Sequence, residues 1–164
     1  MKIGVISDTH LRGPDGLLEK IAGTLFEDAD LILHAGDLVE PEVLAVFSGR
    51  PVLAVAGNMD SPAVREAFPG KRVFSSGRFR IGLVHGWGPP DGIEERLARV
   101  FRDDPVDCLV YGHTHRPANH LRNGVLFFNP GSAGGGFTAR RTVGILEITD
   151  RIAGSIIELE DGTS

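Results

Sequence analysis

Short apolar runs recur along the chain and alternate with polar segments and helical patterns. The runs at 2–7, 30–34 and 51–56 are rich in Val, Ile and Leu, which is typical of strands buried on both faces. Residues 15–27 instead carry apolar side chains at helical spacing, namely Leu17, Leu18, Ile21, Leu25 and Phe26. This alternation predicts parallel strands joined by right-handed helical crossovers.

Two shorter helices are predicted in the same half. Glu40-Pro41 is a favourable opening for a helix over 40–48. Ser61-Pro62 has the form of an N-cap followed by proline at the first helical position, and it opens another short helix.

The second half is richer in strands. The runs at 72–75 and 78–84 flank a Ser-Ser-Gly turn and predict a hairpin. A helix is expected over 91–102, with strands at 106–111, 124–128, 142–149 and 154–159. Each half therefore supplies its own sheet material. The predicted fold is α/β, with two sheets packed face to face and helices outside.

Length and composition are those of one globular domain. The chain has 164 residues, of which 41% are hydrophobic and 24% charged. We expect a single domain over 1–159 and a frayed tail over 160–164. The net charge of −5 argues against a protein that holds long nucleic acid by neutralising phosphates.

The lone Cys108 lies in an apolar run and is expected to be a buried thiol, because one cysteine cannot form an intrachain disulfide. Nothing at the start of the chain resembles a signal peptide, and no apolar stretch approaches the roughly 20 residues that span a bilayer. We therefore expect a cytoplasmic protein that does not bind membranes.

Polar side chains with metal-binding chemistry follow the apolar runs. If the runs are strands, these residues emerge at strand ends, and the carboxyl ends of strands in open α/β sheets border a ligand crevice. Carboxylate, imidazole and carboxamide groups together suit divalent metals of intermediate hardness. The seven candidates are Asp8, His10, Asp37, Asn58, His85, His113 and His115.

Taken singly, most of these residues have ordinary explanations. Asp8 is able to cap a turn, Gly57-Asn58 is a common turn pair, and a lone His85 is more often a core or edge residue than a ligand. His113-Thr-His115 is more specific, because buried imidazoles are costly without partners. The ordered set of seven at the ends of apolar runs favours a metal site.

This order of motifs resembles the calcineurin-like metallophosphoesterase superfamily. The motifs are Asp8-Thr-His10, Gly36-Asp37, Gly57-Asn58-Met59-Asp60, His85-Gly86 and Gly112-His113-Thr-His115. The compact length and the later Asn129-Pro-Gly-Ser132 are similar to the small single-domain phosphodiesterase branch. The resemblance covers residues 2 to about 157 and implies a four-layer αββα sandwich with a binuclear metal centre.

The resemblance also implies how the ligands divide. One metal would be held by Asp8, His10, Asp37 and His115, and the other by Asp37, Asn58, His85 and His113, with Asp37 bridging. A hydroxide shared by the two metals would then attack phosphorus. Mn²⁺ is the expected ion, with Fe²⁺, Ni²⁺, Co²⁺ and Zn²⁺ as alternatives.

Met59 departs from the family pattern. Many relatives have histidine after Gly-Asn, where it is thought to protonate the leaving alkoxide, and methionine has no proton to donate. Asp60 remains but lacks the imidazole that it would orient. Asp37, Asn58 and Asp60 are the expected catalytic residues, and esters with poor leaving groups are expected to turn over slowly.

Other residues near the motifs allow two interpretations. His34 either supports the site or is a satisfied strand-end histidine, and Trp87 either stacks on an aromatic substrate or anchors its loop. Arg12 follows the first ligands but is more simply a solvated loop residue, and His120 is expected to be solvated near a turn.

The leading interpretation is a phosphodiesterase acting on a small soluble substrate. A retromer subunit of the same fold works as a protein-interaction scaffold with its metal histidines partly missing, so a scaffold is the main alternative. An amide hydrolase and a nuclease fit less well, because of the motif order and the acidic balance respectively. A homodimer is plausible, although no residue indicates it.

Overall fold

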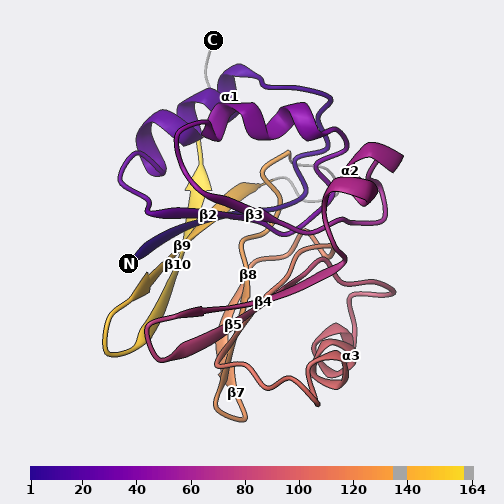
Figure 1. Cartoon of the computed structure of the whole chain (residues 1–164), viewed down its shortest axis with the longest axis vertical. Helices are drawn as coiled ribbons and strands as arrows, with labels where there is room; N and C mark the ends of the chain where they lie inside the picture. The colour runs from indigo at the N-terminus through magenta and orange to yellow at the C-terminus, as the bar shows by residue number, and fades with distance from the viewer. Residues whose placement is uncertain (135–139, 161–164) are drawn as a thin grey trace.

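Two five-stranded sheets form the centre of the protein (Figure 1). The computed structural model describes residues 1–134 and 140–160. In the first sheet β1–β2 and β2–β3 are parallel pairs and the other pairs are antiparallel. Its strands, in spatial order, are β10 (Ile152–Leu159), β9 (Arg141–Ile148), β1 (Lys2–Ile6), β2 (Leu31–His34) and β3 (Val52–Ala54).

The second sheet is also mixed. Its pairs β5–β6 and β6–β8 are parallel, and an antiparallel strand closes each edge. Its strands, in spatial order, are β4 (Lys71–Ser76), β5 (Phe79–Val84), β6 (Cys108–Val110), β8 (Val125–Asn129) and β7 (Ala118–Arg122).

Helices cover the outer face of each sheet. In the first sheet, β1 is followed by α1 (Gly16–Lys20) and the π-helical η1 (Ile21–Leu25), β2 by the 3₁₀ helix η2 (Pro41–Phe47), and β3 by α2 (Pro62–Ala67). The second sheet has α3 (Ile93–Val100). No helix among the described residues is long and apolar enough to span a bilayer.

Three clusters of buried apolar side chains correspond to the three interfaces between layers. Ile3, Val5 and Phe128 belong to the cluster between the sheets. Phe26 and Phe47 belong to the cluster beneath α1, η1 and η2, and a third cluster joins α3 to the second sheet. The predicted four-layer αββα sandwich is confirmed.

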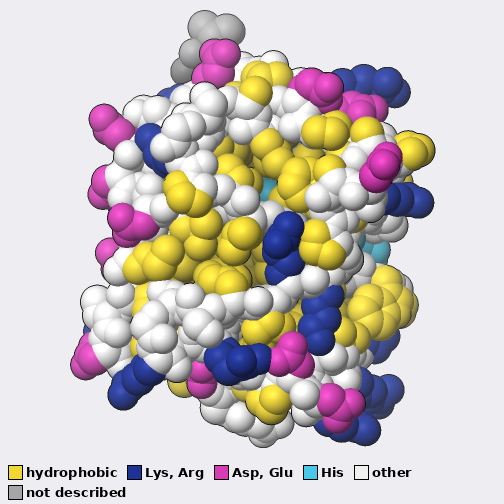
Figure 2. Space-filling model, in the orientation of Figure 1, with side chains coloured by type: hydrophobic (Ala, Val, Ile, Leu, Met, Phe, Trp, Pro, Cys, Tyr) yellow, Lys and Arg dark blue, Asp and Glu magenta, His cyan; other side chains and the backbone are white. Residues whose placement is uncertain are grey.

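The two sheets are joined where their edge strands β3 and β4 come together. Arg72 Nε donates a hydrogen bond of 2.9 Å to the carbonyl of Ala54, and Ala56 N–H donates one of 2.9 Å to Pro69. On this side of the molecule hydrophobic side chains gather across the middle of the surface, with basic side chains among them (Figure 2).

The structure corrects four sequence-based expectations. The two halves of the chain do not each form their own sheet, because β9 and β10 come from the second half and pair within the first sheet. Residues 15–27 are not one regular helix, because α1 passes into the π-helical η1. The helix expected over 40–48 is a 3₁₀ helix. Strand β7 was missed. His120 is exposed near a turn, as expected, but it lies within this strand and pairs with Glu94. The tail expected over 160–164 falls, except for Glu160, outside the described residues.

The physical reason for the missed strand is its position at a sheet edge. Most of β7 is exposed, so it lacks the apolar alternation by which strands are recognised. The sequence signal for this strand lies in the turn that follows it. Asn123 and Gly124 have φ values of 50° and 79°, the positive pair of an Asn-Gly hairpin turn.

Candidate metal centre

All seven candidate ligands lie in loops that follow the carboxyl ends of strands. Asp8 and His10 follow β1, Asp37 follows β2, and Asn58 follows β3. From the other sheet, His85 follows β5, and His113 and His115 follow β6. Parallel strands end at a common edge, so loops from two sheets reach the same place.

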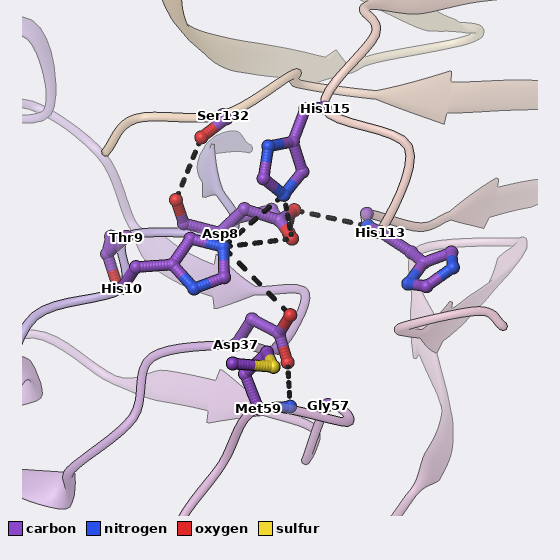
Figure 3. Close-up of polar contacts among 12 residues, drawn as sticks. Asp8, Thr9, His10, Asp37, Gly57, Met59, His113, His115 and Ser132 are labelled. Carbon is purple, nitrogen blue, oxygen red and sulfur yellow. Dashed lines mark hydrogen bonds and ion pairs between the residues drawn. The ribbon is translucent and has the colours of Figure 1, made fainter. Parts of the chain in front are cut away.

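Asp8 lies at the centre of a first cluster. Its Oδ1 is 3.1 Å from His115 Nε2 and 3.8 Å from His10 Nε2, and the two imidazole nitrogens are 3.3 Å apart (Figure 3). The other oxygen, Oδ2, accepts hydrogen bonds from the Ser7 hydroxyl at 2.5 Å and from His113 N–H at 3.1 Å. Only Oδ1 of Asp8 is therefore directed at the imidazoles.

A second cluster forms around Asn58 Oδ1. His85 Nε2 and His113 Nδ1 both lie 3.1 Å from this oxygen. His85 Nδ1 is 2.8 Å from the carbonyl of Ala35, and His113 Nε2 is 2.8 Å from the carbonyl of Gly88. A carbonyl only accepts, so these outer nitrogens carry the protons, and in each neutral ring the inner nitrogen presents a lone pair to Asn58.

Asp37 lies between the two clusters. Its Oδ1 accepts a hydrogen bond of 2.8 Å from Met59 N–H. Its Oδ2 is 3.3 Å from His85 Nε2 in the second cluster and 4.0 Å from His10 Nε2 in the first. The protein thus presents one oxygen of Asp37 to both groups of imidazoles.

These carboxylates favour positive charge on the imidazoles. A hydrogen bond to Asp8 raises the pKa of His115. Burial lowers the pKa of His85, but its hydrogen bond to Asp37 and the charges of Asp8 and Asp37 outweigh burial, and the pKa is raised. Burial opposes ionisation of Asp37 as well, yet the hydrogen bond and charge of His85 lower its pKa.

The donor atoms of these residues are arranged to bind cations. Asp8, His10 and His115 offer atoms within 4.8 Å of each other, and so do Asp8, Asp37 and His85. Asp8 Oδ1 is buried, and the imidazole nitrogens of His115 and His10 lie 3.1 and 3.8 Å from it. A divalent cation in each cluster would satisfy this oxygen and the lone pairs around Asn58, with oxygen and imidazole ligands of the type that such ions accept.

The backbone is strained at most of these ligands. Non-glycine residues rarely adopt positive φ. Five of the seven nevertheless do: Asp8 (54°), His10 (52°), Asp37 (54°), His113 (68°) and His115 (58°). Conformations of this kind persist where the surrounding structure enforces them, and they cluster at functional sites.

Glycines let the loops approach each other. A Cβ on Gly36 would lie 2.7 Å from His85 Nδ1, as expected for a glycine that lets the backbone pass close to another element. A Cβ on Gly57 would collide with Asp37 Oδ1, and one on Gly112 would collide with Ser7 Oγ. The motif glycines are thus required by close packing of ligand loops from both sheets.

Asp60 binds the backbone of the loops that carry Asp37 and Asn58. Its buried carboxylate accepts backbone N–H groups from Val39 at 2.6 Å, from Gly57 at 2.6 Å and from Asp37 at 3.1 Å. It therefore ties the Asp37 loop to the Asn58 loop. This position suits a residue that acts through other groups.

His34 is fully buried below the same loops. Its Nδ1 accepts from Gly36 N–H at 3.2 Å, so its Nε2 carries the proton and donates to Thr9 Oγ1 at 3.2 Å. Thr9 lies between Asp8 and His10. Of the two interpretations, the contacts support His34 as a residue that holds both ligand loops, and it is satisfied in doing so.

Several polar residues hold the site together without a role predicted from the sequence, although Asn129 and Ser132 belong to a motif of the resemblance. Asn129 Nδ2 donates to the carbonyl of Gly112 at 2.9 Å, and Ser132 Oγ donates to the carbonyl of Asp8 at 2.9 Å. Ser7 binds Asp8 directly. The signal was present, because Asn129 ends the apolar run of β8 as the ligands follow the other strands.

Met59 and Trp87 are among the few large apolar residues that are strongly exposed, at 59% and 47%. Met59 adjoins Asn58, and Trp87 is two residues from His85. Arg12 is exposed near the first ligands, without a contact that defines its role among the described residues.

Cys108 is buried, as predicted, and burial raises the pKa of its thiol to about 12.

Comparison with known proteins agrees with this geometry. A sequence profile described as the calcineurin-like phosphoesterase superfamily domain matches residues 1–151. The chain belongs to the calcineurin-like phosphoesterase superfamily. A probable metallophosphoesterase of Methanothermobacter thermautotrophicus is 39% identical over 133 residues, which are 80% of this chain and 77% of that protein.

Solved structures of this phosphoesterase fold superpose over nearly the whole chain. A novel archaeal phosphodiesterase has a TM-score of 0.79 at 26% identity, covering 97% of this chain and 100% of the other. Wild-type Vps29 of Entamoeba histolytica complexed with Zn²⁺ has a TM-score of 0.73 at 26% identity, covering 96% and 99%. The family predicted from the motifs is confirmed.

Proposed function

We propose that the protein is a binuclear-metal-dependent phosphodiesterase that acts on a small soluble substrate. The observation that carries the proposal is the arrangement of donor atoms. Buried carboxylate oxygens and imidazole and amide lone pairs converge from five loops, and Asp37 Oδ2 faces both clusters. Membership of the phosphoesterase superfamily and the name of the archaeal structural neighbour support the same chemistry.

The ligands divide naturally between two cations. Asp8, His10, Asp37 and His115 would hold one, and Asp37, Asn58, His85 and His113 the other. Two divalent cations at these positions would supply Lewis acidity towards phosphate oxygens and would lower the pKa of a bound water molecule. We expect Mn²⁺, and Fe²⁺, Ni²⁺, Co²⁺ and Zn²⁺ meet the same ligand chemistry.

The chain's own residues bind and orient the substrate. Asn58 is exposed, so its amide N–H₂ is able to donate to a phosphate oxygen while Oδ1 faces His85 and His113. Asp37 stays ionised, because its pKa is lowered. Asp60 is a positioning residue that fixes the loop of Asp37 relative to the loop of Asn58.

No protein nucleophile is required. Cys108 is buried within β6, and its raised pKa keeps the thiol protonated at neutral pH. No proton donor takes the place of a histidine at Met59, so leaving groups with low pKa values should be favoured. A phenol leaves without protonation more readily than an alkanol does.

The net charge of −5 favours a small phosphorylated substrate over long nucleic acid. We also propose a cytoplasmic location. The alternative function is a non-catalytic protein-interaction scaffold of the same fold. The presence of all seven donors weighs against a scaffold, which has no need of them.

Hydrolysis of an aryl phosphodiester, with the matching monoester alongside, tests the proposal. Chelator-stripped protein should be inactive and should regain activity as Mn²⁺ is added, with the diester preferred. Activity restricted to the monoester would keep the metal chemistry and reject the substrate class. Folded protein that stays inactive at every Mn²⁺ concentration would favour the scaffold.

A further inference from the structure

We propose that Arg96, on α3, is a positioning residue that fixes His113 in the orientation and tautomer needed to bind a cation. Arg96 lies outside both ligand clusters and acts through the loop between β5 and α3. The inference rests on the proposed function in one respect, since it takes His113 to be a cation ligand.

The loop at 86–92 is poorly able to hold its own shape. Its sequence is Gly-Trp-Gly-Pro-Pro-Asp-Gly. Its glycines Gly86, Gly88 and Gly92 have φ values of 100°, 78° and 73°, and two prolines have no N–H with which to bind neighbouring carbonyls. The carbonyl groups of the loop therefore need donors from elsewhere.

Arg96 supplies these donors from the first half of α3. Its Nε and Nη2 donate to the carbonyl of Trp87 at 3.2 and 2.9 Å, and its Nη1 donates to Asp91 at 3.0 Å. Nη2 also donates to the carbonyl of Pro89. One guanidinium group thus holds three carbonyls across the loop, which only a planar fork of five N–H groups is able to do.

Gly88 lies between Trp87 and Pro89, whose carbonyl groups both accept hydrogen bonds from Arg96. A Cβ at this glycine would be 3.4 Å from Arg96 Cζ, so the loop backbone rests against the guanidinium. Its carbonyl oxygen is 2.8 Å from His113 Nε2. The position of this oxygen therefore depends on the contacts that Arg96 makes on either side of it.

The Gly88 carbonyl decides which nitrogen of His113 is free. Because it accepts the Nε2 proton, Nδ1 is left with a lone pair that faces Asn58 Oδ1 at 3.1 Å. Partners of this kind typically change metal affinity by about 10- to 100-fold. Without the hydrogen bonds from Arg96 to the loop, His113 would sample the other tautomer and other ring rotations. The second cation would then bind more weakly.

Replacement of Arg96 with lysine tests this. Arg96→Lys keeps the charge and the helix propensity, but an ammonium group does not span three carbonyls. In calorimetric titration of chelator-stripped protein with Mn²⁺, we expect one of two equivalents to weaken by about 10- to 100-fold and the other to be unchanged. Arg99→Lys, at an exposed position of the same helix, is the matched control and should bind as the unmodified protein does.

Two further readouts separate positioning from a general structural effect. At alkaline pH, ¹⁵N NMR of the metal-free protein should show His113 protonated at Nε2, and Arg96→Lys should shift it towards a mixture of tautomers. In a double-mutant cycle, Arg96→Lys should add no loss of Mn²⁺ affinity to His113→Ala, because the effect passes through His113.

The outcomes distinguish this inference from the proposed function. If the unmodified protein binds two Mn²⁺ and Arg96→Lys binds both equally well, only the inference about Arg96 is overturned. Additive losses in the cycle, or an unchanged tautomer, also overturn it. Fewer than two Mn²⁺ bound by the unmodified protein would overturn both this inference and the binuclear centre.

Discussion

The candidate ligand residues combine backbone strain with firm anchoring. Asp8 has a φ of 54°, yet its carbonyl accepts from Ser132 and its carboxylate from Ser7 and His113. A non-glycine residue held with positive φ costs on the order of 1–3 kcal/mol. The surrounding hydrogen bonds over-determine the conformation, so the side chain is aimed before any cation binds. Such preorganisation is what catalytic sites need.

Replacement of Met59 should change the leaving-group preference of the enzyme. Met59→His would place an imidazole beside Asn58, where it is able to protonate a departing alkoxide. We expect alkyl phosphodiester turnover to rise by about 10²-fold or more, within the range for general acids, and aryl ester turnover to change little. Rates on paired alkyl and aryl esters measure this.

Met59→Gln is the control for size and polarity at this position, because an amide is not a general acid near neutral pH. Unchanged alkyl-ester turnover in Met59→His, with the fold intact, would contradict the role given to the missing proton donor.

His34 should make the protein sensitive to mild acid. Burial lowers its pKa from 6.5 to about 4, so between these values the folded state holds His34 neutral while the unfolded state binds a proton. Stability present above pH 6.5 is therefore lost as the pH falls towards 4, by up to about 3 kcal/mol. Urea unfolding of metal-free protein from pH 7 to 4.5 measures this loss.

His34→Gln provides the comparison. Glutamine does not titrate and is able to replace both hydrogen bonds, so the variant should lose less stability over that pH range. Parallel curves for the two proteins would show that His34 does not cause the acid sensitivity.

Loops at strand ends are the elements that build the site. Each contributes one or two ligands, and none forms a cluster alone: Asp37 from the loop after β2 faces His85 from the loop after β5 at 3.3 Å. The loops are cross-linked by buried polar groups outside the set of candidate ligands, among them Asp60, His34 and Asn129. The geometry of the centre therefore depends on contacts between elements distant in the chain.

Loss of the Asp60 carboxylate should loosen two of these loops together. Asp60→Asn would turn an amide N–H₂ towards backbone N–H donors, and we expect destabilisation of about 1–3 kcal/mol. Because Asp37 and Asn58 lie on the loops that Asp60 joins, Mn²⁺ affinity should fall as well. Denaturant unfolding and Mn²⁺ titration measure the two effects.

Asp28→Asn is the control, because it removes the same charge at an exposed site. Asp28 pairs with Lys2 there, and exposed ion pairs contribute little to the free energy of unfolding. It should behave as the unmodified protein. Equal effects of the two substitutions would mean that net charge, and not the joining of the loops, explains the result.

In the whole molecule, loops from both sheets surround the site. Candidate ligands from the first sheet and from the second meet at one edge of the sandwich, so a cation bound there would link the two layers. Any group that binds only the folded state stabilises it by mass action. Metal binding should therefore be visible as a change in global stability.

Removal of metal should lower the unfolding temperature. With Mn²⁺ at about 100 times its dissociation constant, linkage gives about 2.7 kcal/mol, which corresponds to a rise of roughly 5–11 °C for a protein of this size. Thermal unfolding with Mn²⁺ and with chelator measures the shift. His115→Ala should show a smaller shift, and an equal shift in this variant would place the stabilising metal elsewhere.

Much of the fold and of the candidate site was predictable from the chain. The ligand residues could be recognised because they directly follow apolar runs, and such runs are strands buried on both faces. The edge strand β7 leaves no apolar alternation and is indicated only by its Asn-Gly turn. The change from α1 to η1 could not be predicted, because the apolar spacing of residues 15–27 is that of one regular helix. The positioning contacts of Asp60, His34 and Arg96 were also hidden, because a polar side chain does not reveal in sequence which distant backbone group it binds.

Local pattern and motif order determined the strands, the layers and the set of candidate ligands, since each depends on short-range spacing of apolar and polar residues. The tertiary structure decided how the ligands face one another: which Asp8 oxygen is free, that Asp37 Oδ2 faces both clusters, and which nitrogen of His113 is exposed to Asn58. These features depend on hydrogen bonds between loops far apart in the chain, and only the packed sheets bring those loops together.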